Sequence, residues 1–144
     1  MILNIEDIKK LIPHRKPFLF IEECKIIVKG KIGESFRIFD ESEYFFEGHF
    51  PNQPIVPGVV IVEAMAQTAG VVVSENLIDN KDKSVLFMSI SKAKFRKPVL
   101  PNFKIKFHVE MINNVKNVYK FLGKAYHNDL LVAESEFSAM ITSK

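Results

Sequence analysis

The feature that most constrains this chain is an apolar helix that follows a proline-rich loop, within the stretch Glu47–Ile78. Residues 47–57 contain three prolines and Gly48, which exclude the interior of a regular helix or strand. Pro57 suits the first position of a helix, and after Gly58 no further breaker occurs before Gly70. We therefore predict a loop and then a helix from Pro57 to about Leu77, roughly 30 Å long at about 1.5 Å per residue.

This helix is apolar on nearly all sides, which indicates that the rest of the chain surrounds it. Its exceptions, Glu63, Gln67, Gly70 and Ser74, are spaced by four, three and four residues and fall on one stripe. A buried carboxylate is costly unless it is paired or used. Glu63 is therefore either a core carboxylate hydrogen-bonded to Gln67 or a functional group.

A histidine in the loop favours the functional alternative. His49 lies in a Gly-His-Phe-Pro sequence, fourteen residues before Glu63. The loop would bring its imidazole close to the helix start, where backbone N–H groups lack partners. His49 and Glu63 are thus candidates for an acid–base pair.

The remaining sequence predicts one short helix and about six strands. Asn4 can cap a helix from Ile5 to Leu11. The predicted strands are Phe18–Val28, Lys31–Phe39, Val85–Val99, a run alternating from Phe103 to Met111, Val115–Tyr126 and Leu130–Thr142. Turns are predicted at Lys29-Gly30, Asn113-Asn114 and His127-Asn128-Asp129, and a polar linker at Asp79–Ser84.

These elements predict a single α+β domain over residues 1–144, in which a curved, mostly antiparallel sheet wraps the central helix. In the second strand Ile32, Phe36 and Ile38 alternate with Lys31, Ser35 and Arg37. A free sheet edge and a helix too apolar for one sheet to cover favour a homodimer with a continuous sheet.

Composition excludes several functional classes. The net charge of +3 gives little support for nucleic-acid binding. The nearest approach to a membrane span, Ile55–Val73, contains Pro57, Glu63, Gln67 and Thr68, which argue against insertion in lipid. A single cysteine, Cys24, excludes an intramolecular disulfide and fits a cytoplasmic location, and no targeting segment is apparent.

The other histidines and the cysteine are predicted to be structural. The four histidines lack the close spacing of metal ligands, so no metal site is predicted. We expect His14 to hold the N-terminal segment, His108 and His127 to be solvated, and Cys24 to pack in a strand.

Three motifs resemble one known family. GHFPNQPIVPGVVIVEAMAQ is similar to the signature of the FabZ-type 3-hydroxyacyl-[acyl carrier protein] dehydratases, and PHRKPFLF (Pro13–Phe20) and KFRKPVLP (Lys94–Pro101) resemble its flanking motifs in the same order. The resemblance implies the hot-dog fold and dehydration of (3R)-hydroxyacyl thioesters to trans-2-enoyl thioesters in type II fatty acid synthesis. It implies no cofactor.

The resemblance also implies roles at the site. His49 would take the proton from C2, and Glu63 would donate a proton to the leaving hydroxyl or position it. The N–H of Gly58 would face the thioester oxygen. The carbonyl of Ile55 would orient the His49 ring. The residues expected to bind substrate are Gly58, Ile55, Phe50 and Gln67.

The implied partner is acyl carrier protein, which is acidic. A basic run of Lys94, Arg96 and Lys97 is either a solvated strand face or its docking surface. The family further implies dimers that assemble into hexamers, in the cytoplasm or, in a eukaryote, in the plastid stroma after loss of a targeting segment.

Two alternative functions remain open, a hot-dog acyl thioesterase and a non-catalytic acyl-binding subunit. Thioesterases of this fold generally lack the Gly-His-Phe-Pro histidine, and a non-catalytic subunit would have lost His49 or Glu63. One position departs from the family, because Asn102-Phe103 replaces the usual Gly-Asp after Pro101. Asn tolerates the left-handed backbone that Gly would adopt, so we expect the turn to be kept.

Overall fold

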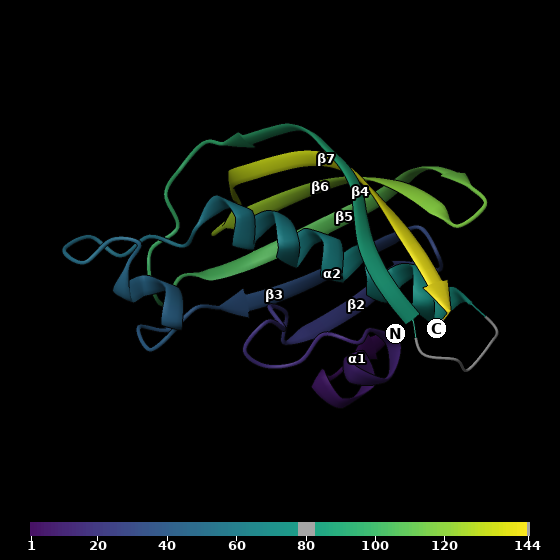
Figure 1. Cartoon of the computed structure of the whole chain (residues 1–144), viewed down its shortest axis with the longest axis horizontal. Coiled ribbons are helices and arrows are strands. Elements are labelled where there is room, and N and C mark those ends of the chain that lie inside the picture. The colour runs from purple at the N-terminus through teal and green to yellow at the C-terminus, as the bar shows by residue number, and fades with distance from the viewer. Residues whose placement is uncertain (78–82, 144) are drawn as a thin grey trace.

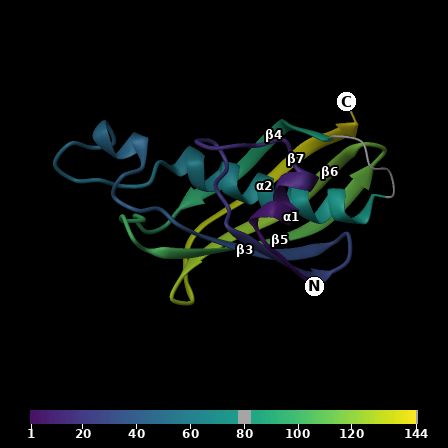
Figure 2. The same cartoon turned by 90° about the horizontal axis from the view of Figure 1, so that it is seen from below.

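A curved antiparallel sheet wraps one long helix, with a short helix packed beside it (Figures 1 and 2). The computed structural model describes residues 1–77 and 83–143. Their elements are β1 (Ile2–Leu3), α1 (Ile5–Leu11), β2 (Glu23–Val28), β3 (Ile32–Ile38), the 3-10 helix η1 (Tyr44–Glu47), α2 (Gly58–Asn76), β4 (Lys83–Phe95), β5 (Lys104–Val115), β6 (Val118–His127) and β7 (Leu130–Ser143). The order in the sheet is β1-β2-β3-β5-β6-β7-β4, which leaves β4 at one edge. The predicted α+β hot-dog architecture is confirmed.

Most predicted elements are present with small shifts at their ends. The helix predicted at Ile5–Leu11 has those bounds, and Asn4 caps it through a reciprocal pair of bonds with Asp7. Asn102 has a φ of 69°, so the left-handed turn expected there is present. The predicted linker Asp79–Ser84 falls largely outside the described residues, and β4 already begins at Lys83.

Two expectations about the strands are wrong, and one short strand was missed. Phe18–Glu22 is not a strand, because side chains from other elements satisfy its backbone groups; β2 begins at Glu23. Asn113-Asn114 lies within β5, and the chain turns at Lys116, where φ is 56°. A seventh short strand, β1, pairs with β2 and was not predicted.

The helix α2 is the core of the molecule, as its sequence predicts. Its residues from Val60 to Ser74 are buried except Glu63, which is partly exposed. By length and composition α2 could cross a membrane, but 78% of its most apolar window is buried inside the protein. This burial identifies it as a core helix.

The strand β3 presents its small residues to α2. Gly33 and Ser35 are buried, whereas Ile38 is 40% exposed. A Cβ on Gly33 would lie 2.4 Å from Cγ2 of Val72, so only glycine allows the helix to approach this closely. The Ser35 hydroxyl lies 2.6 Å from that of Thr68 on the helix. The alternation of apolar residues correctly predicted the strand. However, the apolar residues Ile32, Phe36 and Ile38 do not form its buried face against the helix.

Candidate active site

The loop between β3 and α2 projects from one end of the molecule, at the left of Figures 1 and 2. It contains His49, whose backbone N–H donates to the backbone carbonyl of Phe45 in η1 over 3.0 Å. The peptide bond between His49 and Phe50 is cis, and their rings stack with centroids 4.2 Å apart. His49 is half-buried, and Phe50 is 49% exposed.

The His49 ring is oriented by a single backbone contact. Its Nδ1 lies 2.8 Å from the carbonyl oxygen of Ile55, the contact expected for this residue. A carbonyl only accepts hydrogen bonds, so Nδ1 carries the hydrogen. In the neutral ring Nε2 then has a free lone pair, which is the form required of a base.

Glu63 is the one partly exposed residue in the otherwise buried stretch of α2 from Val60 to Ser74. Its Oε2 accepts a hydrogen bond of 3.0 Å from Nε2 of Gln67, one turn further along. Nε2 of His14 lies 3.4 Å from the same oxygen. Among the described residues Oε1 of Glu63 has no hydrogen-bond partner, so it is available to a bound molecule.

Gln67 is fully buried, and a segment that we call the strap, Phe18–Phe20, fixes its amide. The N–H of Phe20 donates to the amide oxygen over 2.8 Å, and the amide nitrogen donates to the carbonyl of Phe18 over 2.9 Å. Because a backbone N–H can only donate, these contacts determine which way the amide points. The amide N–H₂ group is therefore directed at Glu63.

His14 is a site residue that the sequence interpretation missed. Its side chain is 13% exposed and contacts Glu63. Its Nδ1 is buried and has no hydrogen-bond partner in the described chain. The available signal was its place in the PHRKPFLF motif, whereas spacing alone gave no reason to place it beside Glu63.

The other histidines and the cysteine do not belong to this site. His108 is not simply solvated, because its Nδ1 lies 2.7 Å from a carboxylate oxygen of Glu34. The His127 ring stacks on Phe103 with centroids 3.8 Å apart and is partly exposed, so the expected solvation is kept on its free side. Cys24 is buried, as predicted, and burial raises the pKa of its thiol from 9.0 to about 12. Among the described residues no group of His, Cys, Asp and Glu could hold a metal ion.

Gly58 begins α2, directly after Pro57, and its N–H has no partner within the helix. A Cβ on Gly58 would lie 2.8 Å from the ring of Phe95 on β4. A side chain at this position would therefore displace the Phe95 ring, which packs against the start of the helix.

Within the chain, His49 and Glu63 do not touch. Both are described residues, and no hydrogen bond or ion pair of up to 4.0 Å joins them. Each is nevertheless positioned by its own contacts, His49 by Ile55 and Glu63 by Gln67 and His14.

Comparisons with known proteins agree with this fold and motif set. A FabA-like domain matches residues 12–136. The chain belongs to the FabA-like family. Within it, the chain is 45% identical to the 3-hydroxyacyl-[acyl-carrier-protein] dehydratase FabZ of Nitratiruptor sp., over 99% of each chain. It is 43% identical to the FabZ of Sulfurovum sp. over the whole of both chains. These full-length matches make the chain a FabZ-type member of the family.

One similar solved structure is the dehydratase heterocomplex ApeI:P of Xenorhabdus doucetiae. The TM-score is 0.74 at 11% identity, covering 95% of this chain and 91% of that one. At that identity the match supports the hot-dog fold alone.

Proposed function

We propose that this FabZ-type protein dehydrates (3R)-hydroxyacyl-[acyl carrier protein] to trans-2-enoyl-[acyl carrier protein] in type II fatty acid synthesis. The observation that carries the proposal is full-length identity of up to 45% to proteins of that activity, in a chain that has both His49 and Glu63. No cofactor is needed for this reaction, since it only moves protons and breaks one C–O bond.

Each catalytic group has a chemical task. Nε2 of His49 takes the proton from C2, and the electrons left behind form the C2–C3 double bond as the C3–O bond breaks. Glu63, through Oε1, gives its proton to the departing hydroxyl, which leaves as water. Transfer of the proton from His49 back to Glu63 through solvent restores the starting state.

Negative charge develops on the thioester oxygen while C2 loses its proton. The N–H of Gly58, at the positive end of α2, is suited to stabilise that charge. Phe50 and Ile55, next to His49, and Gln67, next to Glu63, are the further residues that we assign to substrate binding.

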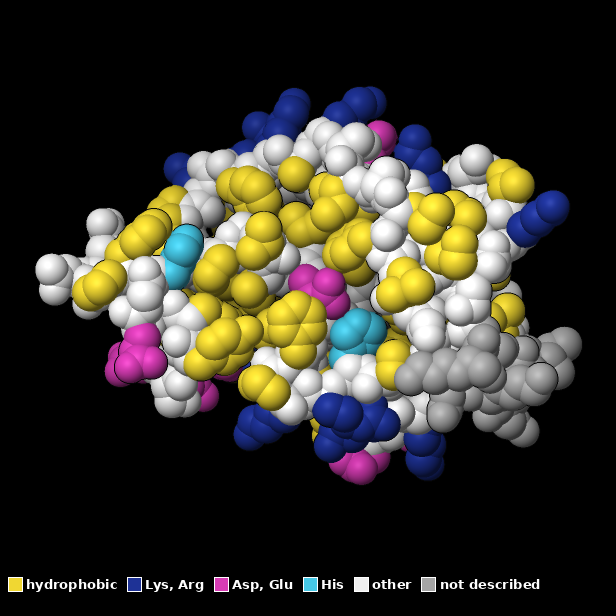
Figure 3. Space-filling model, viewed as in Figure 1, with side chains coloured by type: hydrophobic (Ala, Val, Ile, Leu, Met, Phe, Trp, Pro, Cys, Tyr) yellow, Lys and Arg dark blue, Asp and Glu magenta, His cyan; other side chains and the backbone are white. Residues whose placement is uncertain are grey.

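We assign a homodimer to this protein because of the surface of β4. This strand pairs only with β7, and its other edge is open in the described structure. Four of its large apolar side chains are at least half exposed: Leu86, Met88, Ile90 and Phe95. In Figure 3 hydrophobic side chains cover much of the face on which β4 crosses α2, with Lys and Arg around its border. A second copy pairing along β4 would cover this surface and continue the sheet.

The dimer gives His49 a carboxylate that its own chain does not. We place His49 of one chain beside Glu63 of its partner, which makes two equivalent sites in each dimer. Mixing His49→Ala with Glu63→Gln chains should then recover up to about a quarter of wild-type activity, because half the dimers are hybrids with one intact site of two. Further assembly to a hexamer, and a cytoplasmic location, are part of the proposal through the family alone.

We assign carrier-protein docking to the basic run at the end of β4. Lys94, Arg96 and Lys97 are exposed, although Arg96 already forms an ion pair with Glu134 over 2.8 Å. Charge reversal at Lys94 and Lys97 should raise KM for carrier-linked substrate and weaken its salt dependence. Lys25→Glu, on β2, is the matched control, and an equal response to both changes would place docking elsewhere.

One assay tests the activity against its alternatives. Purified protein is mixed with crotonyl-acyl carrier protein, and both hydration of the double bond and release of free thiol are followed. Hydration without thiol release supports the dehydratase, since the enzyme also catalyses the reverse reaction. Free thiol would identify a thioesterase, and neither product would identify a non-catalytic subunit.

A further inference from the structure

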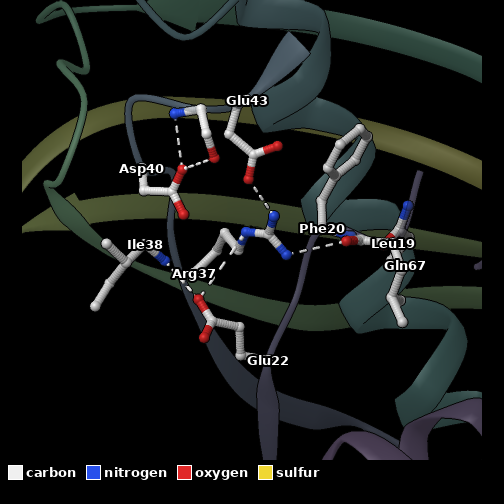
Figure 4. Close-up of polar contacts among 9 residues, drawn as sticks. Leu19, Phe20, Glu22, Arg37, Ile38, Asp40, Glu43 and Gln67 are labelled. Atoms are coloured by element: carbon white, nitrogen blue, oxygen red, sulfur yellow. Dashed lines mark hydrogen bonds and ion pairs between the residues drawn. The ribbon is translucent and has the colours of Figure 1, made fainter. Parts of the chain in front are cut away.

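Arg37 is the charged residue at the centre of a polar cluster beside the site (Figure 4). It lies on β3, and its side chain is only 18% exposed. One end of the guanidinium, Nη1, donates to the carbonyl of Leu19 over 3.1 Å, and the other, Nη2, donates to the carboxylate of Glu43. Its Nε lies 4.0 Å from a carboxylate oxygen of Glu22. The guanidinium thus bridges two segments far apart in the sequence.

The first of these segments is the strap. Leu19 is the middle residue of the strap, and the backbone groups of Phe18 and Phe20 on either side of it fix the amide of Gln67. That amide in turn donates to Glu63. A shift of the strap would therefore turn the Gln67 amide away from Glu63 or leave the buried Phe20 N–H and the Phe18 carbonyl without partners.

The second segment leads to the catalytic histidine. Glu43 directly precedes η1, and its carbonyl accepts from the N–H of Phe46 over 3.1 Å. The next bond along the segment joins the N–H of His49 to the carbonyl of Phe45. The carboxylate of Glu43 therefore anchors, through Arg37, the start of the segment that ends at His49.

The shape of the arginine side chain is what allows both contacts. A guanidinium presents several N–H groups in a planar fork, so it can hold a carbonyl on one side and a carboxylate on the other. A lysine ammonium at the same place keeps the charge but is a compact point donor. Arg37→Lys therefore removes the bridge while preserving the net charge.

We propose that Arg37 is a positioning residue for both catalytic side chains of its chain. It holds Glu63 through the strap and Gln67, and His49 through Glu43 and η1. The inference rests on the proposed function, in which these two side chains serve different sites of the dimer. One Arg37 side chain then supports half of each of the two sites.

Hybrid dimers with one working site provide the test. One chain has His49→Ala and supplies Glu63, the other has Glu63→Gln and supplies His49, and two affinity tags isolate the hybrid. Arg37→Lys is placed in either chain, and kcat and KM are measured on a small 3-hydroxyacyl thioester. We expect kcat to fall about tenfold for both placements with KM little changed, the effect of a misplaced reacting group.

Glu43→Ala separates the two contacts, because it releases only η1. When the chain that supplies His49 carries Glu43→Ala, kcat of the hybrid should fall. When the chain that supplies Glu63 carries it, kcat should stay within about twofold. Glu43→Ala also replaces Arg37→Lys if that variant does not fold. Lys29→Met is the control, because it breaks an exposed ion pair of 3.5 Å to Glu75 at the far end of α2. It should leave kcat unchanged whichever chain carries it.

The inference is overturned if Arg37→Lys leaves kcat unchanged, or if Glu43→Ala costs the same in both chains, as general destabilisation would. A hybrid that recovers no activity before these changes would instead disprove the shared site. Arg37→Lys is then measured in the ordinary homo-oligomer, where a lower kcat at unchanged KM supports the positioning role and an unchanged kcat refutes it.

Discussion

Glu63 and His49 are positioned in opposite ways. Glu63 projects from a buried helix and is held by Gln67 and His14. The strap, which fixes the Gln67 amide, and His14 both lie more than forty residues earlier in the chain. His49 lies in a projecting loop and is held by the backbone of Phe45 and Ile55, within six residues. The carboxylate thus depends on side chains brought together by the whole fold, whereas the imidazole depends on local backbone.

The difference predicts where activity is sensitive to mutation. Side-chain contacts can be removed by substitution, but a contact to a backbone carbonyl survives when the side chain of the residue that provides it is changed. Mutations around Glu63 should therefore be costly far from the reacting atoms, and mutations around His49 should be tolerated unless they alter the loop itself or the Arg37–Glu43 contact that anchors it.

The largest effect is expected at the two residues themselves. His49→Ala and Glu63→Gln should each lower dehydration by at least about 100-fold, the loss expected for a general base or acid. Circular dichroism and thermal unfolding serve as controls for the fold. A well-folded variant that keeps wild-type kcat would refute the role assigned to that residue.

The next effect contrasts the two kinds of support. Gln67→Ala should lower kcat about tenfold and destabilise the fold by about 1–3 kcal/mol, because it leaves the buried Phe20 N–H and the Phe18 carbonyl without partners. Ile55→Val keeps the carbonyl that orients His49 and should leave kcat within about twofold. Kinetics and urea unfolding measure both, and equal losses in kcat for the two variants would contradict the comparison.

A smaller effect is expected at His14. His14→Leu removes the imidazole nitrogen that lies 3.4 Å from the Glu63 carboxylate and should lower kcat roughly fivefold, the equivalent of about 1 kcal/mol. His14→Gln, which can still donate, should restore part of the loss. The control is His127→Leu, whose ring stacks on Phe103 and forms no hydrogen bond or ion pair with Glu63. Loss of stability without loss of kcat would show that His14 is structural.

The smallest effect concerns Cys24, on the buried side of the sheet. Because burial raises the pKa of its thiol from 9.0 to about 12, the folded protein should not react with a thiol reagent at pH 8, whereas the urea-unfolded protein reacts. Between pH 9 and about 12 the unfolded chain releases a proton that the folded chain keeps, so this thiol makes the free energy of unfolding fall as pH rises. Rapid labelling of folded protein at pH 8 would contradict the burial.

The same contrast explains what could be predicted from the sequence. The helix α2, the loop before it and the pair His49 and Glu63 follow from proline placement, apolar composition and local spacing. The bond from His49 to Ile55 was expected only through the family resemblance. The general outline of the sheet followed from the alternation of apolar and polar residues. The exception is Phe18–Glu22, where tertiary contacts replace strand pairing.

The errors arise from contacts over long sequence distances. Phe18–Glu22 has the composition of a strand, but the buried amide of Gln67 satisfies the backbone of Phe18 and Phe20 in place of a neighbouring strand. In β3 the close approach of α2 selects Gly33 and Ser35 for the inner face, which local hydrophobicity cannot reveal. Arg37 looks like an ordinary surface residue of an alternating strand, and only the fold places Leu19 and Glu43 on either side of it.

The exposed apolar edge of β4 also makes this protein's behaviour depend on its own concentration. If a second copy covers that edge, association contributes to the free energy of unfolding, so the melting temperature rises with protein concentration. Dilution then removes the partner surface together with half of each site, and specific activity should fall at the same concentrations at which the melting temperature falls. The rate of synthesis in the cell, through the number of copies available to pair, would therefore set both the lifetime of each chain and the fraction of chains that are active.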